Sequence, residues 1–391
     1  MVPNEFAGGG ALDGQVEALP LRRQKYAEKA TKTAAVAAAT LLLSNFGMEK
    51  IRCVKSSANI LGFRFDPGVI QYKMGNLPKS RVCEAIPFEN TGVDYCGSFF
   101  MKERKLRNRA KIKVNVCVFV CMSIKAVHLE LVSDLSAEGF LAALRRFVSM
   151  RGVPRNIFSD NGTNFVGANN QLKELYVLIN SLSHKEKIEQ FACERKISWH
   201  FIPPLAPHFG GLWESTVKIF KHHFKRVVGT SMFTFEELNT FIVEIEAVLN
   251  SGPITSLSSD PNDIMALTPS HYLIGKAMNT LPEERFTQTA ENRLSVWQHI
   301  IKMRQDFWSR WNLEYLNQLQ ERQKWTKNDP DLKIGTIVMI KDKHQSCFQW
   351  SLGRIEEIHP GDDGITRTTT IRTSSGNIKR TTKLLCPLPI D

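Results

Sequence analysis

The chain has 391 residues, of which 42% are hydrophobic and 23% are charged. These fractions are typical of globular proteins and exclude wholesale disorder, collagen-like sequence and coiled coil. The 51 Lys and Arg residues outnumber the 39 Asp and Glu residues, so a polyanion such as nucleic acid is a candidate partner. No apolar run approaches the roughly 18 residues that span a bilayer, so we expect no membrane partner.

The first 88 residues differ in character from the rest. Residues 1–45 combine a glycine-rich start with an alanine-rich stretch, and we expect them to be poorly ordered or to form an isolated helix. Residues 46–88 carry Pro67 and Pro78 and show no clear hydrophobic period, which is typical of a linker or the remnant of a domain. The eight cysteines of the whole chain include no CxxC pair, which favours reduced thiols inside the cell.

From residue 89 the pattern predicts a mixed α/β core. Three β-rich runs joined by short turns indicate an antiparallel meander at Thr91–Phe100, Val114–Met122 and Ala126–Val132. The middle run, VNVCVFVCM, is almost continuously apolar, which is typical of a strand buried on both faces. A helix follows, with Asp134 or Ser136 as its cap, and it ends before Gly152.

The remaining elements alternate between short strands and helices. Strands are predicted at Asn156–Ser159 and Trp199–Ile202, and helices within Leu172–Arg195, Gly210–Val228 and Phe235–Leu249. Residues 284–325 carry tryptophans at helical spacing and predict an amphipathic helix. From residue 331 short strands separated by Gly-rich turns indicate a small all-β barrel.

Three acidic residues stand out because of their surroundings. Asp94 lies inside the first strand, Asp160 ends a short strand, and Glu214 lies in the first turn of a helix. Carboxylates are rare on buried strands unless they are paired or bind a cation. If the three converge, they form an oxygen site for two Mg²⁺ or Mn²⁺ ions, which can drive phosphodiester chemistry. Taken alone, each of these acids is equally well explained as a turn or cap residue.

The helix that carries Glu214 also carries a basic face. Lys218, Lys221 and Lys225 lie 4, 7 and 11 positions after Glu214 and therefore share its side of the helix. Such a stripe beside a carboxylate site suits a phosphate backbone, and the alternative is an ordinary solvated face. Trp213 is either a core residue or a stacking platform for DNA.

Three segments resemble the core of retroelement integrases, most closely the integrase region of BEL/Pao-type retrotransposons. They are PFENTGVDYCGSFF, FSDNGTNFVGANN and PPLAPHFGGLWESTVKIFKHHFK. The resemblance extends over residues 75–389 and includes the tail, with its KIGTIVMIKD run. It implies an RNase H-like core, a mixed central sheet flanked by helices, at 89–282. A helical linker at 283–325 and a small SH3-like β-barrel at 326–391 would follow.

The same resemblance implies a D,D,E active site. Asp94, Asp160 and Glu214 would be its three acids and would hold two Mg²⁺ or Mn²⁺ ions. Lys218 and Lys221 match positions that contact the DNA ends of the element, and Asn161, Gly162 and Asn164 match the loop that shapes the site.

The activity implied by the resemblance is DNA integration, in which 3′-end trimming is followed by strand transfer into target DNA. The partners would be the element ends and the target DNA. A homo-oligomer is implied because two ends are joined at once. The site of action would be the nucleus, and otherwise the protein would be cytoplasmic.

The sequence departs from the family at its N-terminal side. Integrases carry an HHCC zinc module before the core, but here no histidine precedes His128, and Cys53-Val-Lys-Ser56 resembles a CxxC with its second cysteine replaced. Tetrahedral zinc cannot be assembled from these residues, so we expect no zinc. This departure keeps open a catalytically defective or host-adopted DNA-binding protein that retains the integrase fold. An RNase H-type nuclease is a third reading, which predicts cleavage of an RNA–DNA hybrid.

Overall fold

The computed structural model describes residues 78–103, 111–181, 197–203, 210–257, 264–320, 332–342 and 345–388. The predicted variable segment 1–45 lies outside the described residues, as does most of the predicted remnant at 46–88, including Cys53. Within the described ranges, no helix combines the length and the apolar character needed to cross a membrane.

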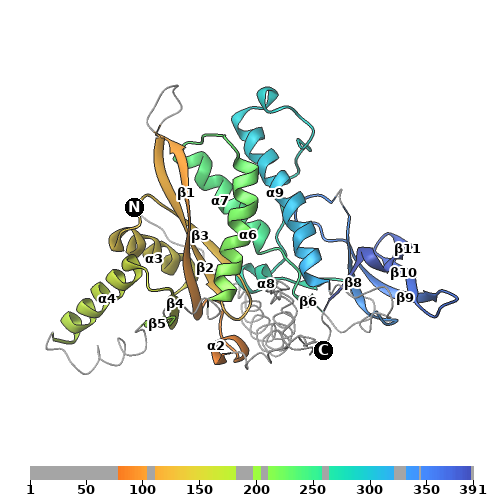
Figure 1. Ribbon diagram of the computed structural model, residues 1–391, viewed down its shortest axis with the longest axis horizontal. Coiled ribbons are helices and arrows are strands. Elements are labelled where there is room, and N and C mark those ends of the chain that lie inside the picture. The colour runs from red at the N-terminus through yellow and green to blue at the C-terminus, as the bar shows by residue number, and fades with distance from the viewer. Residues whose placement is uncertain are drawn as a thin grey trace, which may run out of the picture.

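A five-stranded mixed sheet forms the centre of the molecule, with the strand order β3-β2-β1-β4-β5 (Figure 1). The strands are β1 (Asn90–Lys102), β2 (Lys111–Cys121), β3 (Val127–Val132), β4 (Asn156–Ser159) and β5 (Ser198–Phe201). The first three strands pair antiparallel, whereas β4 runs parallel to β1 and β5 parallel to β4. This topology confirms the expected RNase H-like core.

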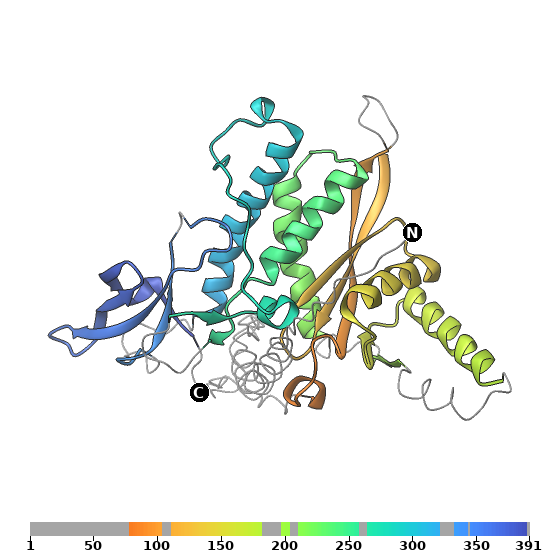
Figure 2. The ribbon, with the colours of Figure 1, turned by 180° about the vertical axis from the view of Figure 1, so that it is seen from behind.

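Helices cover both faces of this sheet, as Figures 1 and 2 show from opposite sides. One face packs on α3 (Ala137–Arg151) and α4 (Thr163–Ser181), and the other on α6 (Gly211–Val228), α7 (Phe235–Leu249) and α9 (Val296–Leu319). Side chains of β2 alternate between the two hydrophobic clusters: Val116 and Val118 face α6, while Cys117 and Phe119 face α3. The strand is therefore buried on both sides, as its apolar run predicts.

Local capping explains where the helices begin. Ser136 is the N-cap of α3, because its side chain accepts a hydrogen bond from the Gly139 amide (2.9 Å). Asp134 supports this cap by accepting from the Ser136 amide (2.8 Å). The N-cap of α7, Thr234, forms a capping box with Glu237.

The edge strand β3 is covered by side chains from the end of α7. The Asn250 carboxamide makes two hydrogen bonds to Val127, accepting from its amide and donating to its carbonyl, both at 2.8 Å. Glu246 accepts from the Leu129 amide (2.9 Å) and contacts His128 Nδ1 (3.1 Å). His128 Nε2 lies 3.0 Å from the second carboxylate, Glu130. Two outward-facing amides of β3 are therefore bonded within the chain.

Helix α9 is packed into the core along its length. It starts at Val296, later than the predicted start at 284. Its Phe307 contacts His223 of α6, and its buried Trp308 and Trp311 pack against Trp350. Short elements that the sequence analysis did not predict join the larger ones: α2 (Lys79–Val82), β6 (Thr255–Ser256), β7 (Ala266–Leu267) and α8 (Pro269–Ile274).

The C-terminal strands form an antiparallel sheet of their own beyond α9, in the order β11-β10-β9-β8-β12. Their bounds are β8 (Ile337–Ile340), β9 (Leu352–Pro360), β10 (Thr366–Thr373), β11 (Gly376–Thr381) and β12 (Leu385–Pro387). Across the described residues β11 and β12 do not pair, so the expectation of a closed barrel is wrong. The reason is that β12 has only three residues and a 3-10 turn at Thr382–Leu384 separates it from the mostly exposed edge strand β11.

Candidate active site

The register between β1 and β4 brings the first two predicted acids together. Gly92 pairs with Phe158 in the parallel ladder, so Asp94 and Asp160 each lie two residues beyond that pair. Asp94 is half-buried because β1 continues past it, whereas Asp160 is exposed because β4 ends at Ser159. The two carboxylates therefore lie at the end of β4, where the sheet gives way to a loop.

Helix α6 adds the third acid from above the same part of the sheet. It lies close to β1 at Gly92, where an added Cβ would be 2.5 Å from Trp213 Cε3. Trp213 is 2% exposed, so it is a core residue and not a free stacking platform. Glu214 follows it and is half-buried, with its carboxylate over Gly210 at the start of the helix.

The three acids influence one another electrostatically. Burial raises the pKa of Asp94 to about 6, and the charges of Asp160 and Glu214 add to the rise. A hydrogen bond from the Tyr95 amide to Asp94 Oδ1 (2.6 Å) and the charge of Lys221 act in the opposite direction. Burial also raises the pKa of Glu214, with a further contribution from Asp160. We call Asp94, Asp160 and Glu214 the acid cluster.

The chemistry of the acid cluster fits a divalent cation. Carboxylate oxygens are the ligands that Mg²⁺ and Mn²⁺ prefer, and burial together with neighbouring negative charge raises the pKa of both Asp94 and Glu214. Over the parts of the chain that are described, however, no three His, Cys, Asp or Glu side chains lie close enough to hold one ion together. The acids thus share one electrostatic environment without meeting at ligand distances.

The loop after β4 is held by its own side chains. Asp160 Oδ1 accepts from the Gly162 amide (3.0 Å), and Asn161 Nδ2 donates to the Ile202 carbonyl (2.8 Å) at the end of β5. The Asn164 carboxamide lies against Gly162, where an added Cβ would be 2.7 Å from Oδ1. Asn161 therefore ties this loop to the end of β5, Asn164 lies beside Gly162, and the predicted contact of both asparagines with DNA stays a prediction.

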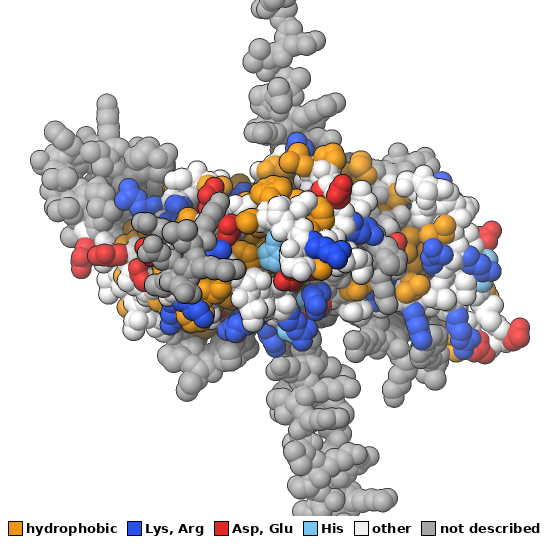
Figure 3. All heavy atoms as spheres, turned by 90° about the horizontal axis from the view of Figure 1, so that it is seen from above, with side chains coloured by type: hydrophobic (Ala, Val, Ile, Leu, Met, Phe, Trp, Pro, Cys, Tyr) orange, Lys and Arg blue, Asp and Glu red, His pale blue; other side chains and the backbone are white. Residues whose placement is uncertain are grey.

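The basic face of α6 is divided between solvent and sheet. Lys218 and Lys225 are exposed, whereas Lys221 is half-buried and its charge acts on both Asp94 and Cys96. On the face of the molecule seen in Figure 3, Lys and Arg side chains are interspersed with apolar and neutral ones and do not form a single patch. Lys221 therefore lies in a different environment from the two exposed lysines, because it is half-buried beside Asp94 and Cys96.

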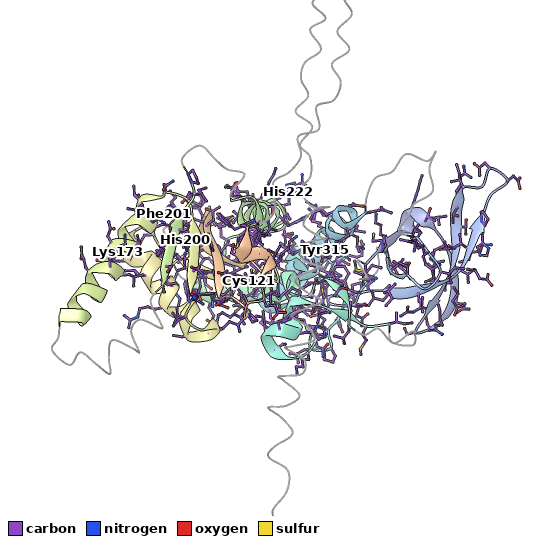
Figure 4. The ribbon with its side chains drawn as sticks, turned by 90° about the horizontal axis from the view of Figure 1, so that it is seen from below. Cys121, Lys173, His200, Phe201, His222 and Tyr315 are labelled. Atoms are coloured by element: carbon purple, nitrogen blue, oxygen red, sulfur yellow. The ribbon has the colours of Figure 1, made fainter. Side chains whose placement is uncertain are left out.

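One aromatic row near the acid cluster was not predicted. His200 on β5, labelled in Figure 4, stacks on Phe158 (4.9 Å between centroids), which in turn stacks on Trp213 (6.5 Å). His200 Nε2 also lies 2.9 Å from Asn156 Oδ1. The sequence of β5, Ser-Trp-His-Phe, does not predict this stacking by itself. The stacking can be inferred only once it is known that β5 pairs with β4.

Comparisons with known proteins give the following. Residues 295–388 match a family described as "Family of unknown function (DUF5641)". No curated protein matches the chain. A chain of the simian T-cell lymphotropic virus intasome, in complex with PP2A regulatory subunit B56 gamma, is similar over 82% of this chain and 85% of its own length. Its identity is 12% and its TM-score 0.32.

Two structures of the HTLV-2 integrase catalytic core domain in complex with magnesium are also similar. The dimeric form has 20% identity and a TM-score of 0.27, covering 42% of this chain and 88% of that one. The trimeric form has 17% identity and a TM-score of 0.29, covering 48% of this chain and 97% of that one.

Proposed function

We propose that the protein is a DNA integrase of the BEL/Pao retrotransposon type, which cleaves phosphodiester bonds and transfers DNA ends into target DNA. The observation that carries this proposal is the acid cluster. Strands β1 and β4 and helix α6 bring Asp94, Asp160 and Glu214 into one electrostatic environment. These are the three residues that the D,D,E resemblance assigns.

In this proposal the acid cluster holds two Mg²⁺ or Mn²⁺ ions. Such a pair would supply activation of the attacking oxygen and stabilisation of the leaving oxygen in an in-line displacement. The chain's own contribution is positional: the Tyr95 amide holds Asp94, the Gly162 amide holds Asp160, and the packing of Trp213 under α6 holds Glu214. No zinc is part of this proposal.

DNA is the proposed partner, both as element ends and as target. Lys218, Lys221 and Lys225 supply the positive charge next to the acid cluster, and Asn161 and Asn164 shape the loop beside it. Because two ends are joined together, the working form is a homo-oligomer. The proposed site of action is the nucleus.

A second candidate is a catalytically defective or host-adopted DNA-binding protein that keeps the fold. The observation in its favour is that, in the described part of the chain, no three potential ligands lie at metal-holding distances. Under this candidate the basic face of α6 still binds DNA, and the acid cluster is a relic.

A strand-transfer assay with short duplex ends and Mg²⁺ or Mn²⁺ separates these candidates. The integrase proposal predicts joined products that Glu214→Gln abolishes, while Glu236→Gln, an exposed acid in the first turn of α7, leaves joining unchanged. DNA binding without joining in the wild type supports the second candidate. Joining that survives Glu214→Gln refutes the catalytic assignment, and cleavage of an RNA–DNA hybrid without joining supports the nuclease.

A further inference from the structure

A buried arginine on the short helix α2 has no counter-ion among the described residues. Arg81, on the short helix α2, is 5% exposed, and its Nε and Nη2 atoms are shielded from solvent and make no hydrogen bond. Across the described residues, no Asp or Glu forms an ion pair with it; the nearby acid Glu89 pairs with Arg155 instead (3.8 Å). Burying an unpaired guanidinium is strongly unfavourable, so this group requires an anion.

A second cation lies beside Arg81. Lys125 closes the turn between β2 and β3 in a left-handed conformation (φ 55°), with its amide bonded to the Cys121 carbonyl (3.1 Å). Glycine or asparagine would satisfy this backbone conformation more easily, so the turn itself does not call for lysine. Figure 4, which labels Cys121, shows α2 next to this turn.

The two side chains repel each other. Burial lowers the pKa of Lys125 to about 8, and the charge of Arg81 contributes to the decrease. Burial also lowers the pKa of Arg81 to about 10. Burial is the largest cause of both decreases, and among the described residues no Asp or Glu forms an ion pair with either side chain.

We infer that Arg81 and Lys125 form a binding site for an oxyanion of the phosphate class. The free Nε and Nη2 of Arg81 are the pair of parallel donors that grip two oxygens of a phosphate group, and Lys125 adds a point charge. The site is separate from the acid cluster. The Met122 amide bonds to the Asn90 carbonyl, which places the turn at the start of β1, about 13 Å along the strand from Asp94.

The occupant has two sources that share this chemistry: a phosphate of a nucleic-acid backbone, or a free phosphate group. The site itself does not depend on the proposed integrase function, since it rests on the two cations alone. Only the assignment of the phosphate to DNA draws on that proposal.

Thermal unfolding of the full chain tests the site. In sodium chloride, Arg81→Met should raise the melting temperature because it removes an unpaired buried charge. At equal ionic strength, replacing chloride with inorganic phosphate should raise the melting temperature of the wild type and leave that of Arg81→Met unchanged. The matched control is Arg155→Met, whose side chain is 76% exposed and which should respond to phosphate as the wild type does.

A second variant, in the turn, keeps the test valid if Arg81→Met fails to fold. Lys125→Asn fits the left-handed position and should reduce the response to phosphate while the protein stays folded. The inference is overturned if phosphate raises the melting temperature of Arg81→Met as much as that of the wild type. It is also overturned if phosphate has no effect on the wild type and Arg81→Met melts lower in chloride.

The salt dependence of duplex binding distinguishes the two sources. If a DNA phosphate occupies the site, Arg81→Met lowers the slope of log K against log salt by about 1, whereas Arg155→Met does not. If the slope is unchanged while the thermal response to phosphate is lost, the site takes a free phosphate group. The site is supported in either case, and a failed strand-transfer assay would leave it standing.

Discussion

Replacing Asp94 with asparagine should stabilise the metal-free protein at pH 8 and have a clearly smaller effect at pH 4.5. The substitution keeps the shape of the side chain and the oxygen that accepts a hydrogen bond from the Tyr95 amide, but it removes the negative charge. In the wild type that charge lies beside two other carboxylates in a half-buried site.

The magnitude follows from the raised pKa. The folded state holds the Asp94 proton to about pH 6, compared with an ordinary value of 3.8. Because the folded state binds the proton more tightly, its stability falls as the pH rises from about 4 to about 6, and the full cost is present above that range. Each tenfold change in proton affinity corresponds to about 1.4 kcal/mol, so the cost is at most about 3 kcal/mol and is reduced by solvent screening.

Urea unfolding at the two pH values, in the presence of a chelator, measures this effect. A useful control is Asp134→Asn at the cap of α3: hydrogen bonds from Ser136 lower the pKa of Asp134, so this substitution should destabilise the protein at pH 8. At pH 8 the two substitutions should therefore change the free energy of unfolding in opposite directions, which distinguishes the acid cluster from an ordinary surface carboxylate. If Asp94→Asn is less stable than the wild type at pH 8, the charges in the cluster are compensated and the reasoning fails.

Three further predictions concern the surroundings of the site. Gly92→Ala places a methyl group against the buried ring of Trp213, so it should cost about 1–3 kcal/mol in urea unfolding and displace the start of α6; unchanged stability and unchanged joining would contradict the packing. Burial alone would lower the pKa of His128, but its two carboxylate partners outweigh burial and raise it. Its stabilising effect relative to His128→Gln should therefore be complete below pH 6.5 and decline as the pH rises through the raised pKa, and an equal stability difference at pH 6 and pH 9 would argue against it. Replacing both Lys218 and Lys225 with alanine should lower the salt slope of DNA binding by about 2, whereas an unchanged slope would make this face an ordinary solvated surface.

The core of the fold could be predicted from sequence because its strands carry a strong signal. A strand buried on both faces, such as β2, must be apolar at almost every position, and the bounds of β4 and α7 were predicted to the residue. Helix α4 was harder. It starts at Thr163, nine residues before the prediction, because Asn and Gly in TNFVGANN favour a loop unless Phe165 and Ala168 have a core to pack against.

The candidate site was only partly accessible to the same reasoning. The sequence identifies Asp94, Asp160 and Glu214 as unusual for their positions, but their proximity depends on the β1–β4 register and on the contact between Gly92 and Trp213. Both are long-range features that no local pattern encodes. The prediction of a closed C-terminal barrel was wrong for a similar reason, because the shortness of β12 and the 3-10 turn before it cannot be predicted from the strand pattern.

The side chains that cover β3 have a consequence for how copies of this protein can associate. An exposed sheet edge can accept a strand from another molecule only through amide and carbonyl groups that have no other partner. At β3 the Val127 and Leu129 amides are already engaged by Asn250 and Glu246, so these two positions are not available to a strand of a neighbouring chain. We therefore expect an assembly that extends the central sheet to grow from the other edge strand, β5, which lies next to the loop that carries Asp160.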